Sequence, residues 1–206
     1  MGRPAERSRA EVTAAAIALA DSEGLEAVTM RRVAAAMGTG PASLYRYVLT
    51  RGELIDLMVD AVAAEYEHVP PTGDWLADIV EVARQTRGLM RRHPWLTTAM
   101  PLRPMLGPHA LDLVEHVLAV LAAHPAAGAT KLQAYAILNG LIGLLTRSEL
   151  TGLGERRAEL TIYLERVAGE GRHPQLAAAM NDTRGGADAF DTIVGRVMTA
   201  LLDPAG

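Results

Sequence analysis

The chain has 206 residues, of which 50% are hydrophobic and 21% are charged, and its formal net charge is -4. This composition is sufficient for an apolar core and excludes a wholly disordered chain. The absence of cysteine excludes disulfides and thiolate metal sites and fits a reducing compartment. The start of the chain lacks the apolar run of a signal peptide, and the longest apolar run, near 134–146, is too short to cross a bilayer. We therefore expect a cytoplasmic protein without a membrane partner.

Charge is unevenly distributed along the chain. Residues 1–51 contain seven arginines and five acidic residues, so this segment carries +2 and the remainder carries -6. A basic N-terminal segment on an acidic body is typical of a small DNA-binding unit attached to a larger domain.

Helical signals dominate the N-terminal fifty residues. Ser8 and Glu11 have the spacing of a capping box, which predicts a helix that ends at Gly24. Thr29 is a suitable N-cap for a second helix over 30–37. Proline at the start of the segment 41–47 predicts a short third helix there, because the first position of a helix needs no N–H donor.

The fourth predicted helix, 51–67, begins with a second capping box formed by Thr50 and Glu53, and Leu49 and Leu54 occupy hydrophobic-staple positions. Prolines and a glycine then interrupt the pattern at 69–73. Further helices are predicted, and no stretch shows the alternation of a strand. These further predicted helices cover 74–92, 95–100, 108–123, 129–150, 155–169 and 187–203.

This order of elements predicts an all-α protein with two functional parts. We expect a three-helix helix-turn-helix domain at 1–49, a connecting helix at 50–68, and a larger domain for ligand binding and dimerisation at 73–206. Gly38 supplies the turn between the second and third helices. Small residues beginning the third helix permit close approach to base edges in the major groove. Many helical proteins contain two short helices and a glycine turn, so spacing alone does not establish DNA binding.

The residue pattern at 29–48, followed by Arg-Gly-Glu-Leu at 51–54, is more specific. Its core is Ser-Leu-Tyr-Arg-Tyr at 43–47, and the segment strongly resembles the TetR (tetracycline-repressor) family. The resemblance implies a helix-turn-helix repressor that binds double-stranded DNA as a homodimer. It implies groove-facing roles for Arg31, Pro41, Ala42 and Ser43, and phosphate contacts by Thr29, Tyr45, Tyr47 and Arg51.

The C-terminal part resembles the tetracycline-repressor type of regulatory domain, notably in Arg-His-Pro-Trp-Leu at 92–96. The positions that bind the drug and its magnesium in that type carry Glu67, Val82 and Met100 here, so we do not expect tetracycline as the ligand. An apolar pocket with a few polar groups is expected instead. Its candidate residues are Met90, Trp95, Met100, Met105, His116, Tyr135 and Asn139. The alternative is that these side chains only pack the core.

A dimer interface is expected on two C-terminal helices. The last helix carries an apolar stripe at i, i+3, i+4, i+7, and the helix around 132–150 is apolar almost all round. We predict an interface of four helices, two from each chain, containing Tyr135, Ile142, Phe190, Ile193, Val194, Val197, Met198 and Leu201. The alternative for the 132–150 helix is a buried central helix of a monomer.

The sequence thus predicts a ligand-responsive regulator, a repressor by resemblance, that is released from a palindromic operator by a small apolar or amphipathic effector. We expect neither a cofactor nor a metal. An enzyme is disfavoured because the sequence lacks the familiar catalytic and phosphate-binding motifs, and its six histidines are scattered. The remaining alternative is a helical protein that binds a small molecule but no operator.

Overall fold

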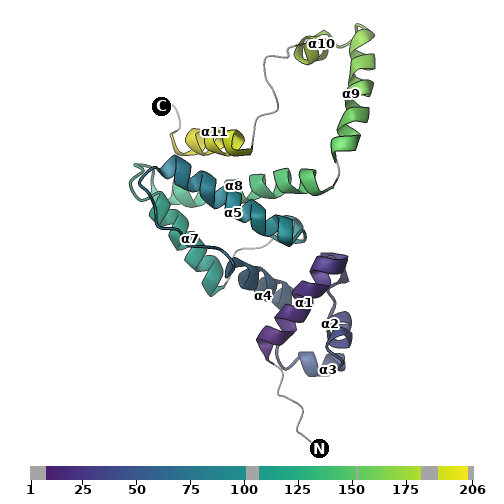
Figure 1. Ribbon diagram of the computed structural model, residues 1–206, viewed down its shortest axis with the longest axis vertical. Helices are drawn as coiled ribbons and strands as arrows, with labels where there is room; N and C mark the ends of the chain where they lie inside the picture. The colour runs from purple at the N-terminus through teal and green to yellow at the C-terminus, as the bar shows by residue number, and fades with distance from the viewer. Residues whose placement is uncertain (1–7, 101–106, 152, 182–189, 204–206) are drawn as a thin grey trace, which may run out of the picture.

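The computed structural model describes residues 8–100, 107–151, 153–181 and 190–203, and within these ranges every regular element is helical (Figure 1). The prediction of an all-α fold is confirmed. A head formed by α1 (Arg9–Glu23), the short 3₁₀ helix at Leu25–Ala27, α2 (Met30–Ala36) and α3 (Pro41–Leu44) lies at one end of the molecule. Helix α4 (Arg51–Ala63) leads from this head to a larger group of helices, which we call the regulatory body after the role that the sequence predicts for it.

Local capping defines the start of α1. The Glu11 amide donates to Ser8 Oγ at 3.1 Å, and the Ser8 amide donates to the Glu11 carboxylate at 2.8 Å, so the predicted capping box is present. The buried face of α1 packs on α4, and Arg9 forms an ion pair with Glu53 of that helix. The head therefore rests directly on the connecting helix.

Helices α2 and α3 form the helix-turn-helix. Gly38 between them has φ +63°, a conformation that side chains with a β-carbon rarely adopt. Val33, Leu44 and Val48 are fully buried at the centre of the head and fix the two helices against each other. Helix α3 is shorter than predicted, because the chain after Leu44 continues as a turn.

The start of α4 differs from the prediction in two contacts. Thr50 Oγ1 accepts from the Glu53 amide at 3.0 Å as expected, but the Glu53 carboxylate accepts from the Leu49 amide at 2.8 Å. The Leu49 side chain is 72% exposed, so the predicted hydrophobic staple with Leu54 is wrong. Helix α4 also ends at Ala63, four residues earlier than predicted, and Tyr66 beyond it is buried.

The regulatory body is built from α5 (Trp75–Arg92), α7 (Pro108–Val120), α8 (Gly128–Leu150) and α11 (Phe190–Leu202). Figure 1 shows α5, α8 and α11 stacked together, with α7 descending beside α4. The short α6 (Leu96–Ala99) packs on α8. Glu149 of α8 accepts hydrogen bonds from Arg87 and Arg91, which holds its far end on α5.

Two helices form an arm beyond α8. Helix α9 (Leu153–Gly169) contacts the end of α8, and α10 (Pro174–Asn181), which the sequence did not predict, packs on α9 (Figure 1). Among their described side chains, Leu160, Ile162 and Tyr163 are more than half exposed. None of the helices in the described ranges combines the length and apolar character that crossing a bilayer requires.

Helix α4 is joined to α7 by a buried carboxylate. The Asp60 side chain is 9% exposed, and its Oδ1 accepts from the Ala110 amide at 2.9 Å. Gly107, the residue before α7, offers no side-chain cap of its own, so a residue of α4 caps the first turn of α7. This contact ties the helix that supports the head to the regulatory body.

Candidate DNA-binding surface and regulatory site

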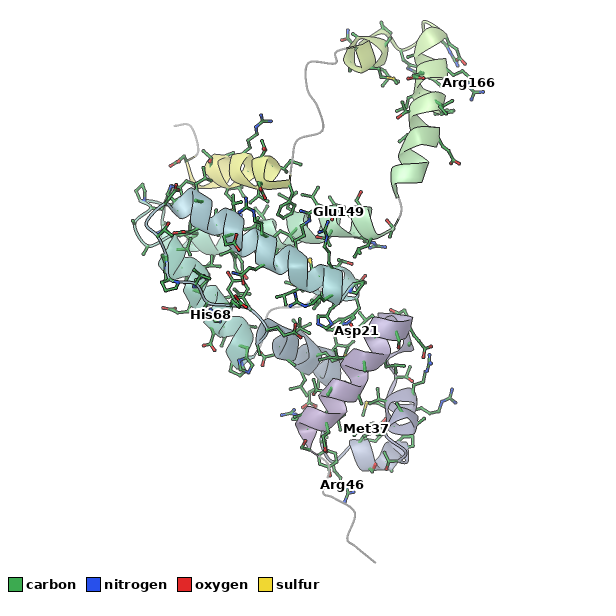
Figure 2. All side chains as sticks on the ribbon, in the orientation of Figure 1. Asp21, Met37, Arg46, His68, Glu149 and Arg166 are labelled. Carbon is green, nitrogen blue, oxygen red and sulfur yellow. The ribbon has the colours of Figure 1, made fainter. Side chains whose placement is uncertain are left out.

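The N-terminal end of α3 forms an open surface on the head. Pro41 and Ala42 are exposed, and Arg31 on α2 and Arg46 after α3 are exposed as well. Figure 2 shows Arg46 at the end of the head that is remote from the regulatory body. The two arginines can contact phosphates or base edges, and the small apolar residues that begin α3 allow close approach to a major groove.

Two predicted DNA-binding residues use their hydroxyls inside the head. Thr29 Oγ1 accepts from the Arg32 amide at 3.2 Å and so caps α2. Ser43 Oγ donates to the Gly40 carbonyl at 2.8 Å and lies 2.7 Å from Thr39 Oγ1. These bonds hold the turn before α3, and the groove-facing role of Ser43 stays a prediction.

The two tyrosines that are predicted to contact phosphate differ in exposure. Tyr45 is 49% exposed and free to reach a phosphate, whereas Tyr47 is partly buried and packs against the core of the head. Tyr47 therefore positions the turn after α3 in addition to any phosphate contact.

Arg51 has a structural role that the sequence did not predict. Its Nε donates to the Val28 carbonyl at 2.7 Å, and its terminal nitrogen donates to the Leu25 carbonyl at 2.9 Å. The guanidinium thus pins the 3₁₀ turn between α1 and α2 to the start of α4. The phosphate contact predicted for Arg51 must use the N–H groups that remain, because two of them are already engaged.

The inner face of α8 carries buried polar atoms. Tyr135 is 4% exposed and Thr146 is fully buried, and neither hydroxyl has a hydrogen bond of ordinary geometry with the described residues. Burial raises the pKa of Tyr135 to about 12, and the Asn139 side chain one turn further offsets part of this rise. Polar groups of this kind are costly inside a core unless they gain a partner. A bound ligand with hydrogen-bonding groups would supply one.

Other predicted ligand residues line the same region of the body. Met90 is fully buried, and a β-carbon added to Gly143 of α8 would lie 3.9 Å from its methyl group and 3.8 Å from the Thr97 carbonyl oxygen. Met100, directly after α6, is partly buried and packs against the core. Met105 lies outside the described residues.

His116 of α7 belongs to an aromatic cluster that the sequence did not predict. Its ring centroid lies 5.6 Å from Tyr66 and 5.3 Å from His68, and Tyr66 and His68 are 5.2 Å apart. Burial lowers the pKa of His116, and the neighbouring His68 lowers it further. Burial likewise raises the pKa of Tyr66, with a further contribution from Tyr135. The cluster therefore places Tyr66 against His116, a predicted ligand residue of α7.

We predict that the cluster makes stability depend on pH. Because the folded-state pKa of His116 lies below its unfolded value of about 6.5, the unfolded chain binds the proton more tightly. The contribution of His116 to the free energy of unfolding should therefore be greatest above about pH 6.5 and should fall as pH drops through the interval between the two pKa values. Thermal melts of the wild type and of His116→Phe, which keeps a ring against Tyr66, test this. An equal decline in both proteins would contradict it.

The structure corrects the predicted dimer interface. Tyr135, Ile142, Val194 and Met198 are at most 4% exposed within the single chain, so they are core residues and are not available to a second chain. Ile137 (43%) and Leu144 (68%), two turns apart on the outward face of α8, are exposed instead, although the predicted interface did not include them. Leu132 (46%), nearer the start of the helix, is exposed as well.

The remaining predicted interface residues, all on α11, are partly buried. They are Phe190, Ile193, Val197 and Leu201. Helix α11 packs on α8, so these residues and the exposed face of α8 belong to neighbouring elements. Their contact with a second chain stays a prediction.

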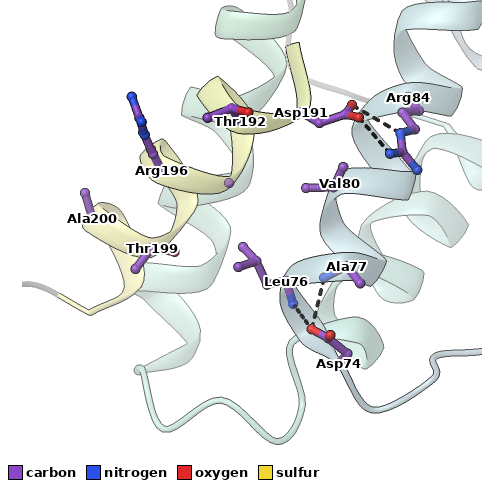
Figure 3. Close-up of a pocket in the computed structure, with 11 residues that line it drawn as sticks. Asp74, Leu76, Ala77, Val80, Arg84, Asp191, Thr192, Arg196, Thr199 and Ala200 are labelled. Atoms are coloured by element: carbon purple, nitrogen blue, oxygen red, sulfur yellow. Dashed lines mark hydrogen bonds and ion pairs between the residues drawn. The ribbon is translucent and has the colours of Figure 1, made fainter. Parts of the chain in front are cut away.

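A groove of about 770 Å³ lies on another side of the body, between α5 and α11 (Figure 3). Leu76 and Val80 line it, and an ion pair of 2.7 Å between Arg84 and Asp191 spans one end. None of the predicted ligand residues lines this groove. Within the described part of the chain, no three histidine, aspartate or glutamate side chains are grouped to hold a metal ion.

Comparison with known proteins agrees with this architecture. Residues 12–55 match the profile described as bacterial regulatory proteins, tetR family, and residues 69–192 match the tetracyclin repressor-like C-terminal domain. The chain is 41% identical over 187 residues to the HTH-type transcriptional repressor DrrR1 of Streptomyces coeruleorubidus, covering 84% of this chain and 69% of that protein. It belongs to the TetR family.

Solved structures of TetR-family proteins resemble the whole chain. Apo ActR from Streptomyces coelicolor superimposes with a TM-score of 0.84 at 26% identity, covering 98% of this chain and all of ActR. ActR in complex with actinorhodin matches with the same TM-score at 27% identity and the same coverage. An HTH-type transcriptional regulator of Saccharopolyspora erythraea is 30% identical over 185 residues, which cover 85% of this chain and 78% of that protein. The predicted family and its all-helical fold are therefore confirmed.

Proposed function

We propose that this TetR-family chain is a ligand-responsive transcriptional repressor that binds a palindromic operator as a homodimer. The observation that supports the proposal is the combination, in one chain, of an exposed helix-turn-helix surface and a body that buries the Tyr135 and Thr146 hydroxyls on α8. The head serves as the DNA-binding domain, α4 as the connection, and the body as the regulatory domain. The repressor DrrR1 and the ligand-bound state of ActR support both halves of this assignment.

The proposed ligand site lies against the inner face of α8. It includes Met90, Tyr135 and Asn139, together with Tyr66 and His116 on the side of α4 and α7. The surroundings are mostly apolar, with the Tyr135 and Thr146 hydroxyls as hydrogen-bonding points. A largely apolar molecule with a few hydroxyl or carbonyl groups fits this chemistry.

The proposed dimer uses the exposed face of α8. Ile137 and Leu144 would meet a second chain together with the partly buried apolar residues of α11. Association of these faces would place two recognition helices on one duplex, with half-sites about 10 bp apart or at multiples of that spacing.

We predict that any compound bound by the regulatory body lowers operator affinity. Compounds that raise the melting temperature of the protein, with actinorhodin among the probes, are added to anisotropy titrations of an operator duplex. Each should weaken operator binding, by about 5- to 150-fold if the coupling has the usual size. Tyr135→Phe should require more compound for release, with its ligand-free operator affinity unchanged. A compound that binds the chain at the Tyr135 site and leaves operator affinity unchanged would contradict the proposal.

A further inference from the structure

The corner where α5 is joined to α6 contacts the end of α1 and the segment after α4. His93 Nδ1 lies 2.8 Å from Asp21 Oδ1, and the Trp95 indole nitrogen donates to the same oxygen at 2.8 Å. On the other edge of the imidazole, Nε2 lies 3.2 Å from Glu65 Oε1. Arg92 donates to the second oxygen of Glu65 at 3.0 Å. One corner of the regulatory body therefore contacts both α1 and the segment after α4.

These contacts lie in a largely buried setting. Trp95 is 4% exposed and His93 is 9% exposed, and their rings meet edge to face at 6.1 Å. Figure 2 shows Asp21 at the end of α1 that faces the body. A carboxylate that accepts from two N–H groups is a charge-assisted acceptor, and partial burial shields it from competing water. The indole nitrogen can only donate, so Trp95 has a fixed role in this contact.

The same corner reaches the inner face of α8. Helix α6 begins directly after Trp95, and the Thr97 carbonyl lies close to Gly143 of α8, next to the Met90 methyl group. Helix α6 therefore lies between Asp21 of the head and the region where we place the ligand. A ligand that displaces α6 from α8 must also move Trp95.

We propose that the contact of Asp21 with His93 and Trp95, which we call the head clamp, sets the orientation of the DNA-binding head relative to the regulatory body. Displacement of α6 opens the clamp and frees α1. His93 and Trp95 are positioning residues, since they act on DNA through α1 and touch no base. The ligand-dependent part of this inference rests on the proposed function, whereas the clamp itself can be tested without DNA or ligand.

The first test measures how tightly the head is held. The chain contains no cysteine, so Ala14→Cys on α1 and Ala122→Cys after α7 introduce two unique labelling sites, both exposed. Pulsed electron paramagnetic resonance on spin-labelled chains, diluted with unlabelled chains, gives the distance between them within one chain. Trp95→Phe removes the indole N–H donor and keeps an aromatic ring. Asp21→Ala removes the carboxylate acceptor and leaves the buried His93 and Trp95 unchanged. Each should broaden the distance distribution at least about twofold, because the head then samples more orientations.

The control is Trp75→Phe, a change in the second tryptophan, whose ring meets His124 at 4.9 Å at the far end of α5. It should leave the distribution unchanged. Melting curves confirm that each variant is folded. A distribution as narrow in Trp95→Phe and Asp21→Ala as in the wild type would overturn the head clamp, whatever the chain does with DNA.

The second test is a readout that a loss of stability alone would not change. Operators with half-sites moved apart by one or two base pairs are compared with the best spacing. A clamped dimer should lose at least about tenfold in affinity per inserted base pair, because its two heads meet the duplex at a fixed separation. Trp95→Phe should lose less than about threefold in affinity per inserted base pair, and it should bind the operator of best spacing more weakly than the wild type does. Equal spacing profiles in Trp95→Phe and the wild type would contradict the clamp, whereas failure of the wild type to bind any duplex would contradict the proposed function instead.

Discussion

Ala42→Asp should abolish specific operator binding. Ala42 is exposed at the second position of α3, where a carboxylate would face the phosphates and the acceptor-rich groove of the duplex. We expect a loss of at least about 100-fold, or about 2.7 kcal/mol. An acidic side chain in the first turn of a helix is favourable for the helix itself, so the head should stay folded.

The control for this variant is Ala122→Asp, which makes the same change of charge at an exposed position after α7. It should bind the operator as the wild type does apart from a small effect of net charge. Anisotropy titrations at two salt concentrations measure both variants, because a DNA-binding head loses affinity steeply with salt. Operator binding by Ala42→Asp within threefold of the control would exclude the assigned docking of α3.

Gly107→Ala should strongly destabilise the fold. Gly107 has φ +152°, and an added β-carbon would lie 2.3 Å from Asp60 Cγ and Oδ1 and 2.7 Å from Asp60 Cβ. The Asp60 carboxylate cannot move away without losing its bond to the Ala110 amide, which caps α7. Backbone strain and overpacking together should cost about 3 kcal/mol or more. Urea denaturation at a fixed protein concentration measures the loss.

Two further variants separate the causes of this loss. Gly171→Ala also places a β-carbon at a positive φ, +73°, but meets nothing within 4 Å, so it should cost only about 1 kcal/mol. Asp60→Ala removes the cap on α7 alone and should cost about 1–2 kcal/mol. The double variant Asp60→Ala/Gly107→Ala should be more stable than the sum of the single effects predicts, because the clash is partly relieved. Equal stability of Gly107→Ala and Gly171→Ala would contradict the contact with Asp60.

Local signals were sufficient to predict much of the fold. The Ser8 capping box, the Thr29 cap and the turn at Gly38 are each encoded within a few residues, and the structure contains all three. Helix α10 was missed because it is short and lies in an alanine-rich stretch, although it begins with Pro174, the same signal that predicted the helix at Pro41. The end of α4 was placed too late, since nothing local shows that Tyr66 turns into the body.

Hydrophobic periodicity did not indicate which face of α8 is available to a second chain. Helix α8 is apolar almost all round, so its sequence does not indicate which face is inside. The structure turns Tyr135 and Ile142 inward and leaves Ile137 and Leu144 exposed. The choice depends on how α5, α6 and α11 pack against α8, and this packing is set by residues far away in the sequence.

Contacts between distant segments were also beyond sequence reasoning. Arg51 reaches the carbonyls of Leu25 and Val28 across more than twenty residues, and Trp95 reaches Asp21 across more than seventy. Resemblance to the TetR family suggested a phosphate role for Arg51, and the apolar residues expected around a pocket suggested a ligand role for Trp95. In the structure, both side chains also form hydrogen bonds with residues of the head.

The most direct test of the central claim is selection of duplexes from a random DNA pool by the purified protein, followed by sequencing of the retained molecules. The account predicts enrichment of a palindrome whose half-sites lie about 10 bp apart, or at a multiple of that spacing, as expected for two recognition helices related by a twofold axis. No enrichment at low salt, or enrichment of a motif without internal symmetry, would contradict a dimeric operator-binding repressor.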